Sequence, residues 1–285
     1  MSCRSLVTVL ATALVLAAWA PSVSATEAEG AARTERLPKR LEDVGVDERL
    51  GGSLPLDLGF TDSSGKPVML REYFDGKHPV IVTLNYADCP MLCSMILNGL
   101  VEAMKQLDWT AGHEYRVVTV SLNPNEGPER ARQSQTRYLS QYARTEDRGA
   151  WHFLTGSEQN VRVLASALGI RYGYNEKRAE YVHPSVISLA SPHGKVARYL
   201  YGIEYHPKTL RLSLVEASEG KIGSSIDKLL LYCFHYDSSE GAYAPVAMNI
   251  MRLSGGLAVL LLGTFLAFLW RGELRRRKLA ENHAA

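Results

Sequence analysis

The stretch VIVTLNYADCPMLC, residues 80–93, decides the fold of this chain and much of its chemistry. Residues 80–86 are a continuous strand-forming run, which is typical of a strand covered on both faces. Apolar residues then recur at every fourth position, which predicts a helix with one buried face. These residues are Leu92, Ile96, Leu100 and Met104. Cys89 and Cys93 therefore stand where a buried strand leads into a helix.

Strands and helices alternate along the following part of the chain. Strands are expected at residues 115–122 and 151–154, and helices at 128–144, 161–168 and 210–217. Hairpins are expected before and after this series, at residues 54–70 and 185–200. Such alternation predicts an α/β fold with a mostly parallel sheet covered by helices on both faces. Because two cysteines occupy the first strand-to-helix junction, the thioredoxin-like fold is the natural assignment.

The cysteine pair is suited to two kinds of chemistry. A helix N-terminus favours the thiolate form of Cys89 and Cys93, and thiolates both attack disulfides and bind soft metals such as copper. Three residues separate the two cysteines, and a disulfide between them is feasible if Cys89 precedes the regular helix. A permanent disulfide is the ordinary alternative in an oxidising compartment. It would close a loop too short to add much stability.

A histidine far along the chain is the third candidate ligand. His183 precedes the strand expected at residues 185–190. In a thioredoxin-like layout, the loop that enters this strand lies beside the N-terminus of the first helix, so the imidazole could reach both sulfurs. Two thiolates and one imidazole suit Cu(I) and can also hold Cu(II).

Other residues with soft donor atoms are compatible with several roles. Cys233 and His235 are separated by one residue. They could form a second metal site, supply a resolving thiol, or be a small buried cysteine beside a surface histidine. Met95 follows the second cysteine of the pair, and packing in the helical core is its expected role, although thioethers suit Cu(I).

Both ends of the chain carry signals for a membrane. Residues 1–25 have the positive start, uncharged core and small-residue cleavage site of a secretory signal peptide, with an uncleaved anchor as the alternative. Residues 253–270 form an uncharged stretch at the lower length limit of a transmembrane helix. The basic tail, residues 271–285, is expected to stay in the cytoplasm by the positive-inside bias.

This topology defines the expected organisation of the chain. The exported part would lie on the periplasmic, extracytoplasmic side of the inner membrane, held by a single membrane pass. It would begin with a charged lead-in at residues 26–50, followed by the thioredoxin-like domain at 51–220 and a membrane-proximal segment at 221–252. The formal net charge of +2 and the absence of interleaved basic and aromatic residues argue against nucleic-acid binding.

Taken together, the sequence resembles the Sco/SenC family of membrane-anchored copper chaperones. The resemblance covers roughly residues 44–250 and rests on the CPMLC motif at 89–93, the VSLNP segment at 120–124, and His183. Residues 199–204 and 232–237 look like a bacterial subgroup with a C-terminal membrane helix. The resemblance implies a thioredoxin-like fold with an N-terminal β-hairpin, and copper ligands at Cys89, Cys93 and His183.

The resemblance also implies a function and partners. The family delivers copper for assembly of the Cu(A) centre of cytochrome c oxidase, so an apo subunit of that oxidase is the implied partner. Another copper chaperone or a thioredoxin-like reductant could also act on the chain. The sequence departs from better-known members at Ser94, where they have proline, and at Asn123, where they commonly have aspartate. These departures bear on the identity of the partner more than on copper binding.

The main alternative is a thiol–disulfide oxidoreductase that keeps the oxidase subunit cysteines reduced for metal loading. That activity requires Cys89 and Cys93 but not His183. A peroxidase of the same fold usually combines a lone thiol with nearby arginine and threonine, which fits a cysteine pair poorly. A copper or redox sensor is a further possibility, although the tail after Trp270 is short. The copper chaperone itself need not be an enzyme.

Overall fold

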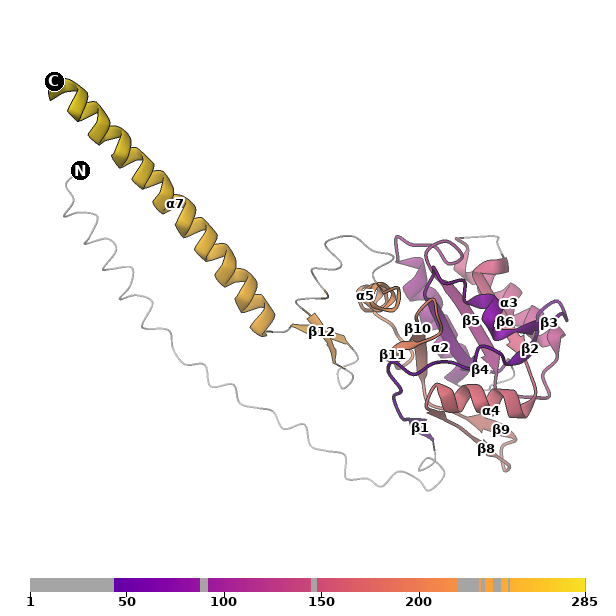
Figure 1. Ribbon diagram of the computed structural model, residues 1–285. Helices are drawn as coiled ribbons and strands as arrows, with labels where there is room; N and C mark the ends of the chain where they lie inside the picture. Colours follow the sequence, from indigo (N-terminus) through magenta and orange to yellow (C-terminus); the bar gives the residue numbers. More distant parts are fainter. Residues whose placement is uncertain are drawn as a thin grey trace, which may run out of the picture. The chain divides into compact units, whose positions relative to one another are not determined.

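The computed structural model describes residues 44–87, 92–144, 148–219, 231, 234–237, 242–245 and 247–284. Its main folded part is an α/β domain built on one seven-stranded sheet (Figure 1). The strands are β2 (Gly59–Asp62), β3 (Pro67–Met69), β4 (Val80–Asn85), β5 (Arg116–Ser121), β6 (Trp151–Thr155), β10 (Val186–Ala190) and β11 (Val196–Tyr201). They lie in the order β11-β10-β4-β5-β6-β2-β3.

The centre of the sheet is parallel and its edges are antiparallel. β5 pairs in parallel with both β4 and β6, whereas β10 pairs with β4 in the antiparallel direction. The hairpin β10–β11 closes one edge, and the hairpin β2–β3 closes the other. All six residues of β4 are buried, which confirms the expectation of a strand covered on both faces. The first hairpin was expected from residue 54, but its first strand begins only at Gly59.

Helices cover both faces of the sheet (Figure 1). One core contains residues of α2 (Leu92–Lys105), α3 (Pro128–Tyr142) and α5 (Pro207–Ala217), and the other contains residues of α4 (Glu158–Ala167). Two short 3-10 helices, η1 (Leu70–Tyr73) and η2 (Arg148–Ala150), precede β4 and β6. The helix expected after the cysteine motif is α2, and its predicted apolar ridge includes Ile96 and Leu100, which are buried. The predicted α/β fold is therefore confirmed.

Single residues define both ends of α4. The side chain of Ser157 caps the start of this helix by accepting a hydrogen bond from the Asn160 N–H. Gly169 follows the helix with a positive φ of 65°, a conformation that glycine adopts at little cost. A β-carbon at Gly169 would also overlap the carbonyl oxygen of Asp47. This close approach belongs to a small ladder between β1 (Gly45–Val46) and β7 (Ile170–Arg171).

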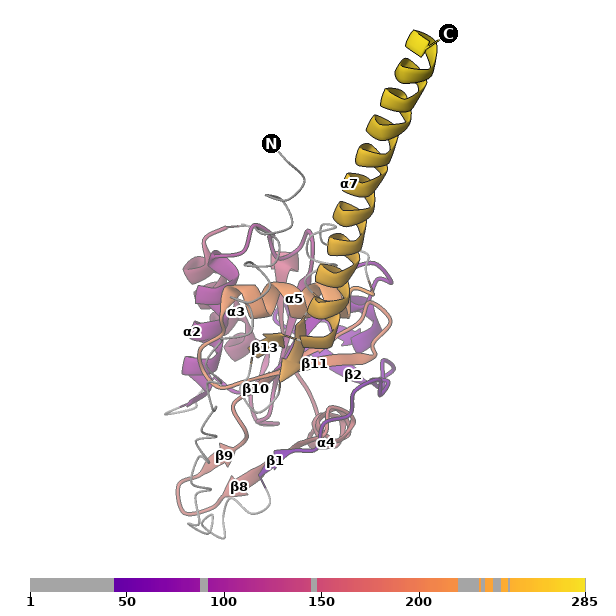
Figure 2. The same ribbon diagram turned by 90° about the vertical axis from the view of Figure 1, so that its left-hand side faces the viewer.

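A second small hairpin occupies the excursion between α4 and β10. β8 (Gly173–Asn175) and β9 (Glu180–Val182) pair in the antiparallel direction, and Figure 2 shows them at one end of the domain. The sequence pattern predicted no strands in this segment. β9 leads directly to the segment that carries His183.

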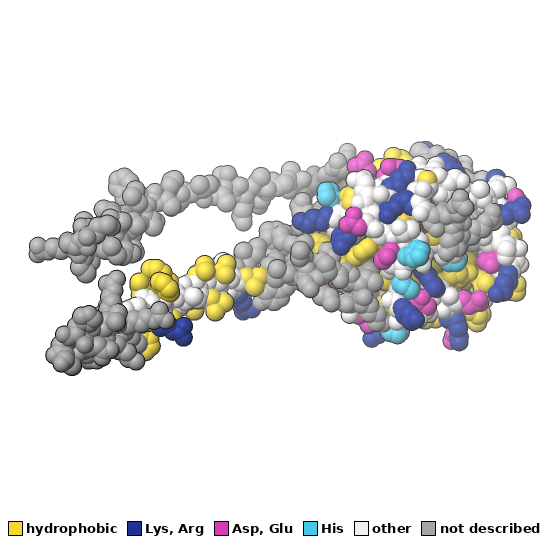
Figure 3. Space-filling view, turned by 90° about the horizontal axis from the view of Figure 1, so that it is seen from above, with side chains coloured by type: hydrophobic (Ala, Val, Ile, Leu, Met, Phe, Trp, Pro, Cys, Tyr) yellow, Lys and Arg dark blue, Asp and Glu magenta, His cyan; other side chains and the backbone are white. Residues whose placement is uncertain are grey.

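The C-terminal part contains one further hairpin and one long helix. β12 (Phe234–Asp237) pairs with β13 (Ala242–Pro245), and α7 (Ala247–Ala284) follows. Within α7, the 22 residues Met251–Gly272 have a mean hydropathy of 2.0 and are long and apolar enough to cross a membrane. The expected transmembrane stretch, residues 253–270, lies inside this segment. Figure 3 shows its hydrophobic side chains on the outside of the helix.

Candidate functional site

Polar side chains gather at the carboxyl ends of the three parallel strands. On the sheet face that α2 and α3 cover, apolar residues such as Ile81 and Val117 belong to the core. Closer to the carboxyl ends, the same face carries buried polar residues, because side chains on one face recur at every second position. They are Thr83, Asn85, Thr119, Ser121 and Thr155. Ligands of α/β proteins commonly bind outside this edge of a sheet.

Part of this polar group is satisfied internally. The hydroxyls of Thr83 and Thr119 lie 2.8 Å apart, and the Trp151 indole N–H donates to the Thr119 hydroxyl at 2.8 Å. Asn85 differs, since its side-chain oxygen and nitrogen are both buried without a hydrogen-bond partner among the described residues. Buried polar groups are usually paired because an unpaired one costs about 1–3 kcal/mol.

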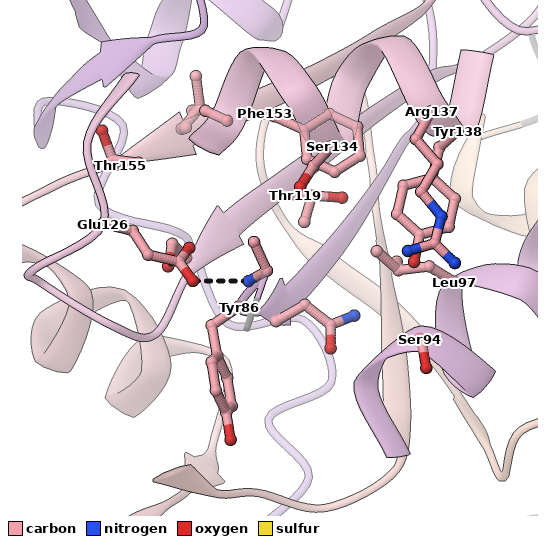
Figure 4. A pocket seen from close by; sticks show the side chains of 15 residues that line it. Tyr86, Ser94, Leu97, Thr119, Glu126, Ser134, Arg137, Tyr138, Phe153 and Thr155 are labelled. Atoms are coloured by element: carbon pink, nitrogen blue, oxygen red, sulfur yellow. Dashed lines mark hydrogen bonds between the residues drawn. The ribbon is translucent and has the colours of Figure 1, made fainter. Parts of the chain in front are cut away.

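Glu126 fixes the chain where it leaves β4. Its carboxylate accepts a hydrogen bond from the Ala87 N–H at 2.7 Å and another from the Ser121 hydroxyl at 2.6 Å. Figure 4 shows the bond to Ala87. Ala87 is the last described residue before the cysteine motif, so the loop between β5 and α3 anchors the entry to that motif. No pattern in the sequence pointed to Glu126, since the contact depends on this loop folding back over β4.

Tyr86 joins the segment that leads to Cys89 to the segment that leads to His183. Its hydroxyl donates to the Tyr181 carbonyl oxygen at 3.2 Å, and the two rings lie 5.7 Å apart in an edge-to-face arrangement. Burial raises the pKa of the Tyr181 phenol, which therefore stays neutral at physiological pH. Tyr86 lies three residues before Cys89, and Tyr181 lies two residues before His183. Their contact therefore holds the segments that lead to these two predicted ligands side by side.

The strand register leads to the same neighbourhood. Ser188 lies opposite Val82 in the antiparallel pair β10–β4. Continuing this register along the strands would place His183 opposite Ala87. His183 itself is partly buried between β9 and β10, and its Nδ1 lies 3.1 Å from the Pro184 carbonyl oxygen. With the proton on Nδ1, this bond orients the ring and leaves Nε2 as the nitrogen suited to a metal.

The other predicted site residues are only partly described. Cys89 lies outside the described residues, and Cys93 belongs to the first turn of α2, with its side chain outside them. Cys233 also lies outside the described residues, and His235 pairs with Ala244 in the hairpin β12–β13. Among the described residues, no three histidine, cysteine or acidic side chains form a group that could hold a metal ion. The ligand set therefore remains a prediction.

The expectation for Met95 is wrong. Its side chain is 44 % exposed instead of packed in the core. Ile96 and Leu97 are the buried residues of this turn, whereas Met95 lies on the exposed side of α2. Ser94, which replaces the proline of better-known family members, lines a pocket over the polar edge of the sheet.

A comparison with family models identifies the chain. The model of SCO1/SenC proteins matches residues 53–216, which is more than half of the sequence. The chain belongs to the SCO1/SenC family. The match encloses Cys89, Cys93 and His183, whereas β12, β13 and α7 lie outside it. Among curated proteins, no sequence matches the chain.

Solved structures with a similar fold include several Sco proteins. A protein assigned to electron transfer from Aquifex aeolicus VF5 aligns with a TM-score of 0.53 and 23% identity, covering 60% of this chain and 95% of that one. Arabidopsis thaliana ScoI, solved with copper bound, aligns with a TM-score of 0.47 and 20% identity, covering 60% and 99%. BsSco, a member of the Sco family of cytochrome c oxidase assembly proteins with a disulfide switch, aligns with a TM-score of 0.47 and 22% identity. The alignment covers 62% of this chain and 96% of BsSco. The sheet topology and the family match agree with the thioredoxin-like fold expected from the sequence of this SCO1/SenC chain.

Proposed function

We propose that the chain is a membrane-anchored, extracytoplasmic copper-binding chaperone that delivers copper for assembly of the Cu(A) centre of a cytochrome c oxidase. Its ligands are Cys89, Cys93 and His183. The observation that carries this proposal is the SCO1/SenC match, which encloses all three residues. The contact between Tyr86 and Tyr181 supports it, because these tyrosines precede the first thiol and the histidine closely.

The donor set accounts for selectivity toward copper. Two thiolates and one imidazole favour Cu(I) and tolerate Cu(II), whereas hard cations such as magnesium prefer oxygen ligands. A site at the carboxyl edge of the sheet can present its copper to another protein. An apo oxidase subunit would accept the metal by exchanging ligands one at a time, and a second copper chaperone would supply it. A thioredoxin-like reductant would keep Cys89 and Cys93 reduced, since a disulfide between them cannot bind copper.

The topology of the chain suits this role. We infer a signal peptide over residues 1–25, a charged lead-in over 26–50, a copper-binding domain over 51–220 and a membrane-proximal segment over 221–252. The apolar segment of α7 would then cross the inner membrane once, and the basic tail at 271–285 would lie in the cytoplasm. This arrangement holds the copper site on the periplasmic side, where the Cu(A)-bearing part of an oxidase is assembled.

A copper titration tests the proposal. The full-length, reduced protein in detergent should bind about one Cu(I) per chain, and the variant His183→Ala should bind it at least about tenfold more weakly, because one of three ligands is lost. His113→Ala is the matched control, since His113 is exposed in a turn of the same domain. Unchanged affinity in His183→Ala would contradict the three-ligand site.

The thiol–disulfide oxidoreductase is distinguished by a second measurement. A reductase requires Cys89 and Cys93 but not His183, so His183→Ala would leave disulfide turnover on an apo-subunit peptide intact. A chaperone without reductase activity shows no turnover in either protein. Turnover together with weak copper binding in the unmodified protein would favour the reductase.

A further inference from the structure

The pocket over the polar edge of the sheet has a composition that metal transfer does not require. It is lined by residues from β4, β5, α2, the β5–α3 loop, α3 and β6. Its cavity volume is about 50 Å³. Because a single water needs about 10–15 Å³ on this measure, the cavity accommodates only a few non-hydrogen atoms.

One wall of the pocket is an unsatisfied amide. Asn85 is 2 % exposed and lines the pocket, and neither its nitrogen nor its oxygen has a partner among the described residues. A leucine or valine of similar size would avoid this cost. The amide is therefore available to hydrogen-bond to a molecule inside the pocket.

Two further donors face the same space. Arg137, on the exposed side of α3, turns its guanidinium over the Tyr138 ring, and it makes no ion pair among the described residues. Figure 4 shows Arg137 and Ser94 on the same side of the pocket. Ser94 lies in the first turn of α2, where the partial positive charge of the helix also favours an anion.

The acidic residue of the pocket, Glu126, leaves room for an anion beside Arg137. Glu126 lies at the other end of the pocket from Arg137 (Figure 4). Both of its carboxylate oxygens already accept hydrogen bonds, from Ala87 and Ser121. The space between Asn85, Ser94 and Arg137 therefore offers mainly N–H and O–H donors and one positive charge.

We propose that this pocket is a binding site for a small carboxylate anion of the size of formate or acetate. The guanidinium of Arg137 and the amide nitrogen of Asn85 would donate to the carboxylate oxygens. The Ser94 hydroxyl would donate either to the anion or to the Asn85 amide oxygen. The cavity volume favours anions of this size over larger ones. The site uses no proposed copper ligand, so it can be studied on the copper-free protein.

Saturation-transfer NMR on the ligand protons tests this site directly. Formate and acetate are titrated into the copper-free, full-length protein in detergent at constant ionic strength, and benzoate serves as the size control. We expect saturable binding of formate and acetate and none of benzoate. Arg137→Gln should weaken formate binding roughly tenfold or more, because it removes a charge-assisted hydrogen bond. Ser94→Ala should weaken it by a smaller factor.

The control variant is Arg132→Gln, which removes another exposed arginine from α3 that does not line this pocket. It should bind formate as the unmodified protein does. Equal binding in Arg137→Gln and Arg132→Gln, or binding of benzoate as tight as that of acetate, would overturn the proposal. A complete absence of saturable formate binding to the unmodified protein would overturn it as well. None of these results bears on copper binding, so the two proposals fail separately.

Discussion

At the scale of single residues, Tyr86 and Glu126 decide how the cysteine motif is entered. The Tyr86 hydroxyl donates to the Tyr181 carbonyl oxygen, and the Glu126 carboxylate accepts a hydrogen bond from the N–H of Ala87, the next residue along the chain. Three segments that are distant in sequence therefore meet at the end of β4. The chain therefore enters the segment that carries Cys89 and Cys93 from a fixed point of the fold.

Removing one hydroxyl tests this connection. Tyr86→Phe deletes the hydrogen bond to the Tyr181 carbonyl and retains the ring contact. We expect a loss of about 0.5–1.5 kcal/mol in the free energy of unfolding, which is typical of one hydrogen bond. Copper affinity should fall in parallel if the bond positions the histidine segment. Tyr174→Phe, at a largely exposed ring, is the control and should change neither quantity.

Acid sensitivity should arise in part at the opposite end of β4. Burial raises the pKa of Asp75, but hydrogen bonds from His78 and Lys77 and the nearby Arg116 guanidinium outweigh it, so the pKa lies below its ordinary value of 3.8. A lowered pKa stabilises the folded state above that ordinary value, and the contribution is lost as the pH falls below it. Asp75→Asn should therefore destabilise the protein clearly at about pH 5 and by a smaller amount at about pH 2, closer to the lowered pKa. Urea unfolding at both pH values measures this, and an equal effect at both would contradict it.

At the scale of elements, the position of α2 depends on a glycine in its interior. Gly99 faces the connection between β11 and α5, and a β-carbon there would overlap the Ile203 carbonyl oxygen. Alanine normally stabilises a helix interior by up to about 1 kcal/mol over glycine. Here the close packing of α2 reverses that expectation.

Gly99→Ala should therefore destabilise the protein, by about 1–3 kcal/mol as for other overpacked sites. Because α2 carries Cys93, the variant should also bind copper more weakly. Gly173→Ala is the control, since no atom lies within 4 Å of a β-carbon built at Gly173. A Gly99→Ala variant as stable as the unmodified protein would show that the connection yields to the added methyl group. Denaturant midpoints of both variants provide the measurement.

The elements also show what sequence reasoning could reach. β4, β5 and α2 were predictable, because buried strands and amphipathic helices repeat a local pattern over six or more residues. The ladder β1–β7 has two residues in each strand, too few for any pattern. The unpaired amide of Asn85 and the anchor at Glu126 depend on which side chains the tertiary fold brings nearby. Met95 was misjudged for the same reason, since periodicity does not tell which helix face remains uncovered.

At the scale of the whole molecule, α7 is the candidate membrane anchor of the proposed function. Its described side chains are exposed and apolar over a length that fits a bilayer. If α7 is the only anchor after removal of the signal peptide, a chain ending at residue 246 should be found in the soluble periplasmic fraction. The full-length chain should stay with the membrane and resist extraction by high salt. Membrane retention of the shortened chain would indicate a second anchor.

The contact between Tyr86 and Tyr181 spans 95 residues of sequence, and this has a consequence for folding. Contacts of such separation form late, because closing a long loop costs entropy before the contact repays it. A newly made chain therefore exposes its thiols before the histidine segment reaches them. Tight copper capture would then mark a finished fold, whereas the half-made domain is left with a cysteine pair open to oxidation.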